Sequence, residues 1–273
     1  MADYSRYEFI KVENDHGVAT VMLNRPDSLN AVNGGLHSEL ERIWGDLADD
    51  SEINAIVLTG AGRAFCAGGD VKGMSSGALT GAPAGTSRRS SSFATAAHGR
   101  RIVQNMLEVE QPIIGAINGD AIGLGSTIAL LCDVIVASEK ARFGDTHVKV
   151  GIVAGDGGAV IWPLLIGPAR AKEFLMRGNL INGAEAVKIG LVNYAVAPEL
   201  VVPRANEIAR ELADGATLAI RWTKLAVNKW LKEQVNLVLD ASLAYEMLTM
   251  ATEDHREATR AFVEKRKPQF KGN

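Results

Sequence analysis

Two glycine-rich segments, each placed after an apolar run, are where backbone groups of this sequence could do chemistry. Residues 63–70 (RAFCAGGD) follow the β-branched run 53–59 (INAIVLT), and residues 119–126 (GDAIGLGS) follow the run 112–118 (PIIGAIN). Each run is typical of a buried strand, and glycine lets the main chain approach a ligand without a Cβ in the way. Two such junctions, each offering one backbone N–H, are what an oxyanion hole needs. The alternative for either segment alone is a tight turn with no further role.

Five short motifs, in the same order along the chain, resemble those of the crotonase (enoyl-CoA hydratase/isomerase) superfamily. The two glycine segments are similar to its F-C-A-G-x-D motif and its N-G-x-A-x-G-G-G loop. The other three matches are LNRP at 23–26 with LNA at 29–31, CD at 132–133 with FG at 143–144, and AFVEKRKP at 261–268. The resemblance implies an α/β fold built as a spiral of ββα units over residues 1–197. It also implies a C-terminal helical region, 198–273, which builds trimers or dimers of trimers and completes the CoA site.

The composition fits an enzyme that acts on small molecules. The chain has 273 residues, of which 47% are hydrophobic and 22% charged, and its net charge is −3. This balance argues against nucleic acid or an anionic membrane as the main partner. The two cysteines, Cys66 and Cys132, offer no disulfide framework, and the N-terminal residues resemble no signal peptide. We therefore expect a cytoplasmic protein with no membrane-spanning segment.

Hydrophobic periodicity predicts a mixed α/β order in the first two thirds of the chain and mostly helices after Pro168. Residues 74–92, rich in Ser, Gly, Ala and Thr, are expected to form a mobile surface loop. The expected strands are 7–13, 18–23, 53–59, 112–118, 133–138 and 191–196. The expected helices are 35–47, 93–109, 127–132, 169–177, 184–189, 199–213, 218–231 and 237–250, before a basic amphipathic tail, 254–273.

The resemblance implies that the N–H groups of Gly69 and Leu124 form the oxyanion hole, next to the positive end of helix 127–132. The family usually has glycine where Leu124 stands, so the leucine side chain could narrow the pocket. Residues at or near the family's substrate and CoA positions are Arg25, Ala67, Asp70, Lys72, Phe262 and Lys265, with Arg88 and Arg89 as further phosphate candidates. The alternatives are solvated charges, a turn cap for Asp70 and subunit packing for Phe262.

Both glutamates that the family's hydratases use to add water are replaced here. The position on the helix after the glycine loop is Thr127, and the position after the F-G pair is His147. A threonine hydroxyl does not ionise near neutral pH, whereas an imidazole titrates close to it. His147 is therefore our candidate acid/base, and the role of Thr127 stays open.

A second set of residues offers a histidine–carboxylate arrangement. Asp145 lies close to His147 in sequence, Asp156 stands in the turn 153–158, and Glu246 lies on a late helix. A carboxylate can fix the tautomer of an imidazole and stabilise its charged form. This pattern resembles the β-diketone hydrolase branch of the superfamily, typified by 6-oxocamphor hydrolase. The alternatives are a structural His147, an Asx-turn or N-cap Asp156 and a surface or interface Glu246.

The function expected from the sequence is enoyl-CoA hydratase or isomerase chemistry on an acyl-CoA thioester. His147 would act with Asp156, and Thr127 and Glu246 are further candidates. The alternatives are hydrolysis of a C–C bond in a β-diketone or β-keto thioester, and a catalytically silent member that binds acyl-CoA. We expect no metal, because no His/Cys/Asp cluster has ligand spacing, and no cofactor other than CoA as part of the substrate. His98 is expected to lie on the surface.

Overall fold

The computed structural model describes residues 2–71 and 88–273, with side chains from residue 96 onward in the second range. Most of the low-complexity segment, and with it Lys72, lies outside these residues. No helix in the described part of the chain is long and apolar enough to cross a membrane.

The described strands form two sheets. In the larger one the order is β1-β2-β3-β5-β7-β10, and in the smaller one β4-β6-β8-β9. Strands of the larger sheet are β1 (Ile10–Asp15), β2 (Val18–Leu23), β3 (Ala55–Gly60), β5 (Ile113–Ile117), β7 (Val134–Ser138) and β10 (Tyr194–Val196). Strands of the smaller sheet are β4 (Ala64–Cys66), β6 (Asp120–Ile122), β8 (Arg142–Gly144) and β9 (Ile181–Asn182). The hairpin β1–β2 and the pair β8–β9 are antiparallel, and the other pairs are parallel.

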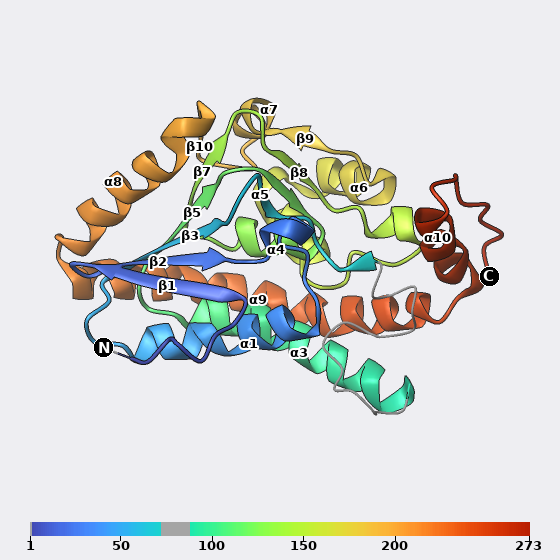
Figure 1. Cartoon of the computed structure of the whole chain (residues 1–273), viewed down its shortest axis with the longest axis horizontal. Coiled ribbons are helices and arrows are strands. Elements are labelled where there is room, and N and C mark those ends of the chain that lie inside the picture. Colours follow the sequence, from blue (N-terminus) through green and yellow to red (C-terminus); the bar gives the residue numbers. More distant parts are fainter. Residues whose placement is uncertain (1, 72–87) are drawn as a thin grey trace.

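The chain alternates between the two sheets in a repeating unit. One strand joins the larger sheet, the next joins the smaller, and a helix follows: β3-β4-α3, β5-β6-α4 and β7-β8-α5. Figure 1 shows this winding in the colour order of the chain. The expected spiral of ββα units is confirmed. The first strands of these units are parallel, so β3 and β5 end at the same edge of the larger sheet. The two glycine segments, which follow β3 and β5, therefore lie close together.

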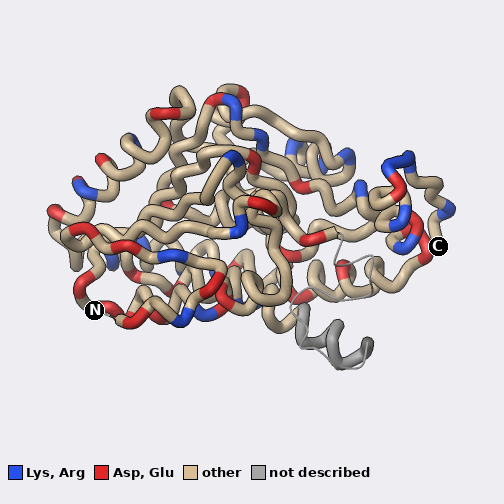
Figure 2. The backbone as a smooth tube through the Cα atoms, in the orientation of Figure 1, with Lys and Arg blue, Asp and Glu red and all other residues tan. Residues whose placement is uncertain are grey.

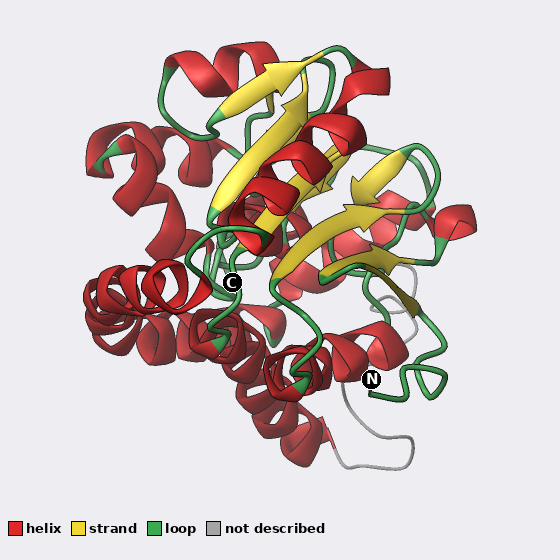
Figure 3. Ribbon diagram, turned by 90° about the vertical axis from the view of Figure 1, so that its left-hand side faces the viewer, coloured by secondary structure: helices red, strands yellow, loops and turns green. Residues whose placement is uncertain are grey.

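Helices cover both faces of the larger sheet (Figures 1 and 3). Successive side chains of a strand point to opposite faces, and in β3 both sets are buried: Ile56 and Leu58 lie in the main core, while Val57 packs in a second cluster with Ala205 and Ala209 of α8. Burial on both faces explains why residues 53–59 form a continuous apolar run. The helices are α1 (Gly34–Asp49), α3 (Arg88–Glu108), α4 (Leu124–Leu130), α5 (Gly158–Ile166), α6 (Pro168–Arg177), α7 (Gly183–Lys188), α8 (Val201–Ala213), α9 (Thr217–Met250) and α10 (Glu253–Val263).

The structure corrects several expected helix boundaries. The helices expected at 218–231 and 237–250 are one helix, α9, because residues 232–236 (KEQVN) contain no breaker and Val235 is buried. Helix α5 is not predicted by the sequence, since Pro163 lies inside it. Helix α3 begins at Arg88, inside the expected loop.

Two further corrections bear on the site and on the C-terminus. Helix α4 begins at Leu124 rather than at 127. Helix α10 ends at Val263, so the tail after it is not helical, and its basic residues lie among acidic ones (Figure 2). Arg266, for example, forms ion pairs with Glu257 and Glu264.

Candidate active site

The two glycine segments are packed directly against each other. Gly68 has a φ of +85°, and a Cβ on it would lie 2.6 Å from the carbonyl oxygen of Ile122. A Cβ on Gly125 would lie 2.4 Å from the carbonyl oxygen of Cys66. Only glycine therefore fits at both positions. The contact shows that segments about fifty residues apart form one loop pair, as the sequence predicts for a shared site.

The backbone of the first loop orients the N–H of Gly69. The Gly68 carbonyl accepts from the N–H of Val32 at 2.8 Å, and the N–H of Asp70 donates to the Val32 carbonyl at 3.1 Å. Because both neighbours of Gly69 point at Val32, its own N–H points the opposite way. This N–H finds no acceptor within residues 2–71 and 88–273.

The second donor is the first N–H of α4. Gly123, with a φ of +54°, precedes the helix, so the N–H of Leu124 has no partner inside it. The side chain of Leu124 is buried and packs in the main core rather than standing free in a pocket. The side chain that Leu124 has in place of the family's usual glycine therefore packs in the core, and the backbone N–H is retained.

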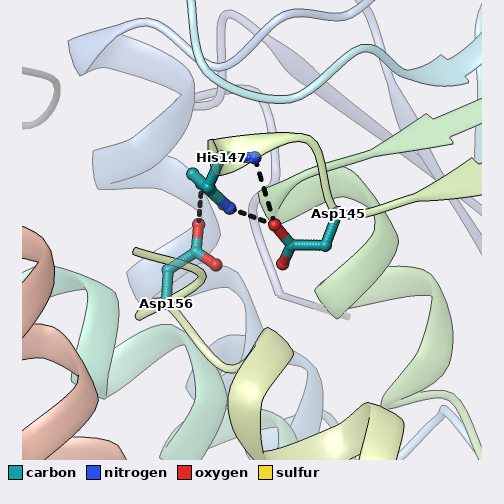
Figure 4. Close-up of side chains that lie close together, drawn as sticks. All are labelled: Asp145, His147 and Asp156. Carbon is teal, nitrogen blue, oxygen red and sulfur yellow. Dashed lines mark hydrogen bonds and ion pairs between the residues drawn. The ribbon is translucent and has the colours of Figure 1, made fainter. Parts of the chain in front are cut away.

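A buried imidazole lies between two carboxylates beside these loops (Figure 4). The Nδ1 of His147 lies 2.6 Å from Oδ1 of Asp145, which also accepts the backbone N–H of His147 at 3.2 Å. On the other side of the ring, Nε2 lies 3.4 Å from Oδ2 of Asp156. Asp145 therefore holds the ring, and Asp156 lies at its second nitrogen. Asp156, the carboxylate expected to assist His147, thus lies next to the ring, and Asp145 is a second carboxylate in contact with it.

The imidazole is in contact with the oxyanion loops. A Cβ on Gly123 would lie 3.4 Å from Cε1 and 3.7 Å from Nε2 of His147. The edge of the ring that carries Cε1 and Nε2 therefore lies next to Gly123, the residue before Leu124.

Glu246 reaches the same cluster from α9. Its side chain is buried and lies over Gly155, where a Cβ would be 2.6 Å from Oε2. That oxygen has no hydrogen-bond partner in the described part of the chain. Burial, together with the charge of Asp156, raises the pKa of Glu246 well above its usual value. Burial thus favours the neutral form of this carboxyl group, and the surface alternative for Glu246 is wrong.

Opposing effects act on the pKa of His147. Burial of the ring lowers it, but the carboxylates of Asp145 and Asp156 outweigh burial and hold the pKa well above its usual value. Thr127, which is buried, donates from Oγ1 to Oδ1 of Asp156 at 3.5 Å. The cluster thus contains an imidazole, its two carboxylate neighbours, a hydroxyl donor and the buried carboxyl group of Glu246.

The three residues Asp145, His147 and Asp156 each place one possible ligand atom within 4.8 Å of the others. The spacing of these residues along the sequence does not predict this group. The lack of ligand spacing in the sequence is therefore not enough to exclude a metal. A metal needs a neutral imidazole with a free lone pair. Here both ring nitrogens face carboxylates that favour the protonated ring. The arrangement suits proton transfer better than metal binding.

Of the expected substrate contacts, Arg25 and Asp70 interact with each other. Their side chains approach to 3.8 Å, and Arg25 also donates to the Ala31 carbonyl. This pair ties the 23–26 segment to the first glycine loop. Ala67, half-buried, donates its N–H to Leu29.

The remaining expected contacts lie outside the cluster. Phe262 is 54% exposed, and Lys265 follows the end of α10 with an exposed side chain. His98 is not a simple surface residue, because its side chain is largely covered and hydrogen-bonds Glu41.

The sequence matches a family model described as enoyl-CoA hydratase/isomerase over residues 13–273. The chain belongs to the enoyl-CoA hydratase/isomerase family. It is 35% identical to the short-chain-enoyl-CoA hydratase of Clostridium acetobutylicum, over 94% of this chain and 95% of that protein. It is 32% identical to the 1,2-epoxyphenylacetyl-CoA isomerase of Escherichia coli, over 97% and 99%. The crystal structure of an enoyl-CoA hydratase/isomerase from Mycobacterium paratuberculosis superposes with a TM-score of 0.85 at 38% identity, covering 94% of this chain and 99% of that one.

In this hydratase/isomerase family member, Asp145→Asn should weaken the dependence of stability on pH. The pKa of His147 is raised on folding, so its contribution to the free energy of unfolding is complete below about pH 6.5 and is lost as the pH rises through the folded pKa. Removing the Asp145 carboxylate lowers that folded pKa, because burial then dominates. Urea unfolding between about pH 6 and 9 measures the effect.

The matched control is Asp120→Asn, which removes an exposed carboxylate paired with Arg142. It should leave the pH dependence in this window unchanged. Turnover of Asp145→Asn should fall by about 10²-fold, since the ring loses its orienting partner. An unaltered pH dependence in Asp145→Asn would show that Asp145 does not hold the imidazole charged.

Proposed function

We propose that this protein acts on acyl-CoA thioesters and adds water to the double bond of a 2-enoyl-CoA. The observation that carries the proposal is the position of the His147 imidazole next to Gly123, the residue before Leu124, since a Cβ on Gly123 would lie 3.4 Å from the ring. The N–H groups of Gly69 and Leu124 bind the thioester oxygen as it becomes an enolate. Oxyanion donors of this kind are each worth about 3–4 kcal/mol in the transition state. The relatives described above are named for enoyl-CoA chemistry.

The cluster supplies the proton transfers. The His147–Asp156 pair takes one proton from the attacking water as its oxygen bonds to C3 of the acyl group. Electrons of the double bond move onto the thioester oxygen. Glu246, whose pKa is raised by burial, gives a proton to C2 as the enolate collapses. A proton passing from the pair back to Glu246 restores the starting state, so addition of water is balanced.

Cleavage of a C–C bond is the second candidate, and the imidazole at position 147 favours it. In a β-diketone, the same pair would activate water for attack on one carbonyl carbon. The bond to the neighbouring carbon then breaks, and the leaving enolate is held by the same two N–H groups. An imidazole flanked by carboxylates suits attack of water on a carbonyl carbon. This route needs no CoA.

The experiment that tests the proposal is a substrate panel read by absorbance and mass spectrometry. It contains trans-2-enoyl-CoAs of increasing chain length beside cyclic β-diketones and β-keto thioesters. Loss of the enoyl-thioester chromophore with a gain of one water supports the hydratase. Ring opening of a diketone with no reaction of enoyl-CoAs supports the C–C hydrolase. Binding of acyl-CoA with no turnover of any compound supports a silent binding protein.

Phe262, Lys265 and the pair Arg25–Asp70 stay our candidates for contacts with CoA or substrate, together with Ala67. Lys72 stays a sequence prediction. No cofactor other than CoA is part of the proposal. The cytoplasmic location also stays a prediction.

We propose that residues 198–273 join subunits into a trimer or a dimer of trimers. Every strongly exposed large apolar side chain in the described residues lies between Met176 and Phe270. On α9, Trp230, Leu237 and Leu248 recur at spacings of seven and eleven residues, which keep them on one helix face. An apolar face of this kind is typical of an interface between subunits.

Trp230→Glu should reduce the oligomer to smaller species. Trp230 is 55% exposed in the single chain, and a carboxylate placed in an apolar interface loses its hydration without gaining a partner. Light scattering coupled to size-exclusion chromatography measures the mass. The control is Lys11→Glu on β1, an exposed position in the hairpin, which should leave the mass unchanged. A wild-type monomer would contradict the proposal outright.

A further inference from the structure

The turn that carries Asp156 has little conformational preference of its own. Gly155 precedes Asp156, Gly157 and Gly158 follow it, and Gly157 has a φ of +118°. Glycine restricts the backbone less than any other residue. The Asp156 carboxylate nevertheless lies 3.4 Å from Nε2 of His147. Contacts with other segments must therefore fix the position of this turn.

Helix α9 turns one polar face toward the turn. Ser242, Glu246 and Thr249 follow one another at spacings of four and three residues, which places them on the same side of the helix. The hydroxyl of Ser242 donates to the Gly155 carbonyl at 2.7 Å. Oγ1 of Thr249 accepts the N–H of Val153 at 3.1 Å. Two hydrogen bonds thus join the turn to α9.

The backbone of the turn lies directly against the helix at Gly155. A Cβ on Gly155 would lie 2.5 Å from the Ser242 carbonyl oxygen and 2.5 Å from Cβ of Glu246. On the other side, a Cβ on Gly157 would lie 2.5 Å from Cγ2 of Thr127 in α4. The turn is therefore held between two helices, and the Ser242 hydroxyl is the polar contact next to Asp156.

Ser242 is a hydroxyl on the buried face of α9, where Leu239 and Leu243 are hydrocarbon, and it is only 4% exposed. A buried hydroxyl is costly unless it is hydrogen-bonded. Its oxygen also lies 3.0 Å from the Leu239 carbonyl, a contact within the helix that serine commonly makes. The bond to Gly155 is the shorter of the two, and it is the one that reaches another segment.

We propose that Ser242 is a positioning residue whose hydroxyl holds the Gly155 carbonyl and thereby keeps the Asp156 carboxylate at Nε2 of His147. This inference rests on the proposed function, because it assigns the hydroxyl a part in proton transfer by the His147–Asp156 pair. Ser242 acts through the turn and not on the substrate.

Ser242→Ala tests the proposal. Alanine is the better helix former of the two residues, so the variant should fold. Once the Gly155 carbonyl is released, the Asp156 carboxylate is no longer held at the ring, and kcat should fall about tenfold or more. KM should stay within about threefold, because the hydroxyl bonds the protein's own backbone. Ser242→Thr keeps the hydroxyl and should keep kcat within about threefold of the wild type.

A second measurement does not depend on turnover. Three carboxyl groups act on the His147 ring: Asp145, Asp156 and, from α9, Glu246. Burial lowers the pKa of His147, but Asp145 and Asp156 outweigh it, so the stability that the ring contributes is lost as the pH rises through the raised folded pKa. Withdrawal of Asp156 lowers that folded pKa. Urea unfolding between about pH 6 and 9 should therefore show a weaker pH dependence in Ser242→Ala.

The matched control is Thr259→Val. Thr259 is a buried residue of α10, 5% exposed, whose Oγ1 bonds the carbonyls of His255 and Arg256 in its own helix. Loss of this hydroxyl should change stability alike at every pH and leave kcat unchanged.

The inference is overturned if Ser242→Ala keeps the wild-type pH dependence of unfolding, or if Ser242→Thr is as impaired as Ser242→Ala. A wild type that turns over nothing in the substrate panel would overturn the proposed function instead. The pH dependence of unfolding would then still decide whether Ser242 holds Asp156 at the ring.

Discussion

Replacing His147 should abolish most turnover and leave binding of acyl-CoA nearly unchanged. The ring is the group that lies against Gly123, beside the oxyanion loop, and it links Asp145 to Asp156. A positioned acid/base contributes about 10²–10⁴-fold to the rate, so kcat of His147→Ala should fall by that factor. Steady-state kinetics on the compound identified in the panel and calorimetry with a saturated acyl-CoA measure the two effects separately.

Stability has to be controlled in this experiment. Removing the ring leaves two buried carboxylates without their counter-ion, which costs about 3–5 kcal/mol. His147→Gln keeps an amide donor and should fold better, yet it cannot accept and release a proton. Both variants should lose activity.

The matched surface control is His16→Gln. His16 forms the same kind of pair with Asp15, also with 2.6 Å between Nδ1 and Oδ1, but it is 90% exposed. It should keep full turnover. Turnover of His147→Gln within about threefold of the wild type would remove His147 from the mechanism.

Gly68→Ala should cost the enzyme about 10²-fold or more in kcat. The new Cβ would lie 2.6 Å from the Ile122 carbonyl oxygen, and the φ of +85° is one that alanine rarely adopts. The loop must move, and the N–H of Gly69 moves with it. Misplacing one oxyanion donor costs about 10²–10³-fold in kcat. KM should change less than kcat, because the donor acts mainly on the charge that develops in the transition state.

Gly167→Ala is the control, because it introduces the backbone strain of alanine at a positive φ without a steric clash of the new Cβ. Gly167 has a φ of +80°, and its Cβ would meet nothing within 4 Å. This variant should lose some stability and keep its turnover. If Gly68→Ala retained wild-type kcat, the first loop would not supply an oxyanion donor.

Much of the fold could be predicted because the sequence patterns that indicate its strands and loops involve residues close together in the chain. Continuous apolar runs mark strands buried on both faces, and glycines mark the loops after them. The errors also have local causes. Residues 232–236 lack an apolar pattern strong enough to predict that the two halves of α9 are continuous. Pro163 lies inside α5, so the sequence does not predict a helix there. Tertiary packing overrides such weak or misleading preferences.

The candidate site was predicted only in part. The oxyanion loops and the pairing of His147 with carboxylates follow from motif order and residue type. Which ring nitrogen each carboxylate approaches could not be predicted, because this depends on the folded chain. In the structure, Asp145 lies at Nδ1 and Asp156, the carboxylate expected to assist His147, lies at Nε2.

By itself, then, the sequence determined the family, the two glycine loops and the absence of the usual glutamates at positions 127 and 147, since these depend on residue type and order. Only the tertiary structure decided that Glu246 is buried beside Gly155 and that Leu124 packs in the core. The physical reason is that the burial of a side chain is set by segments distant in the sequence. Helix α9 brings Glu246 to the turn that holds Asp156 from about a hundred residues away, and desolvation there raises the pKa of its carboxyl group.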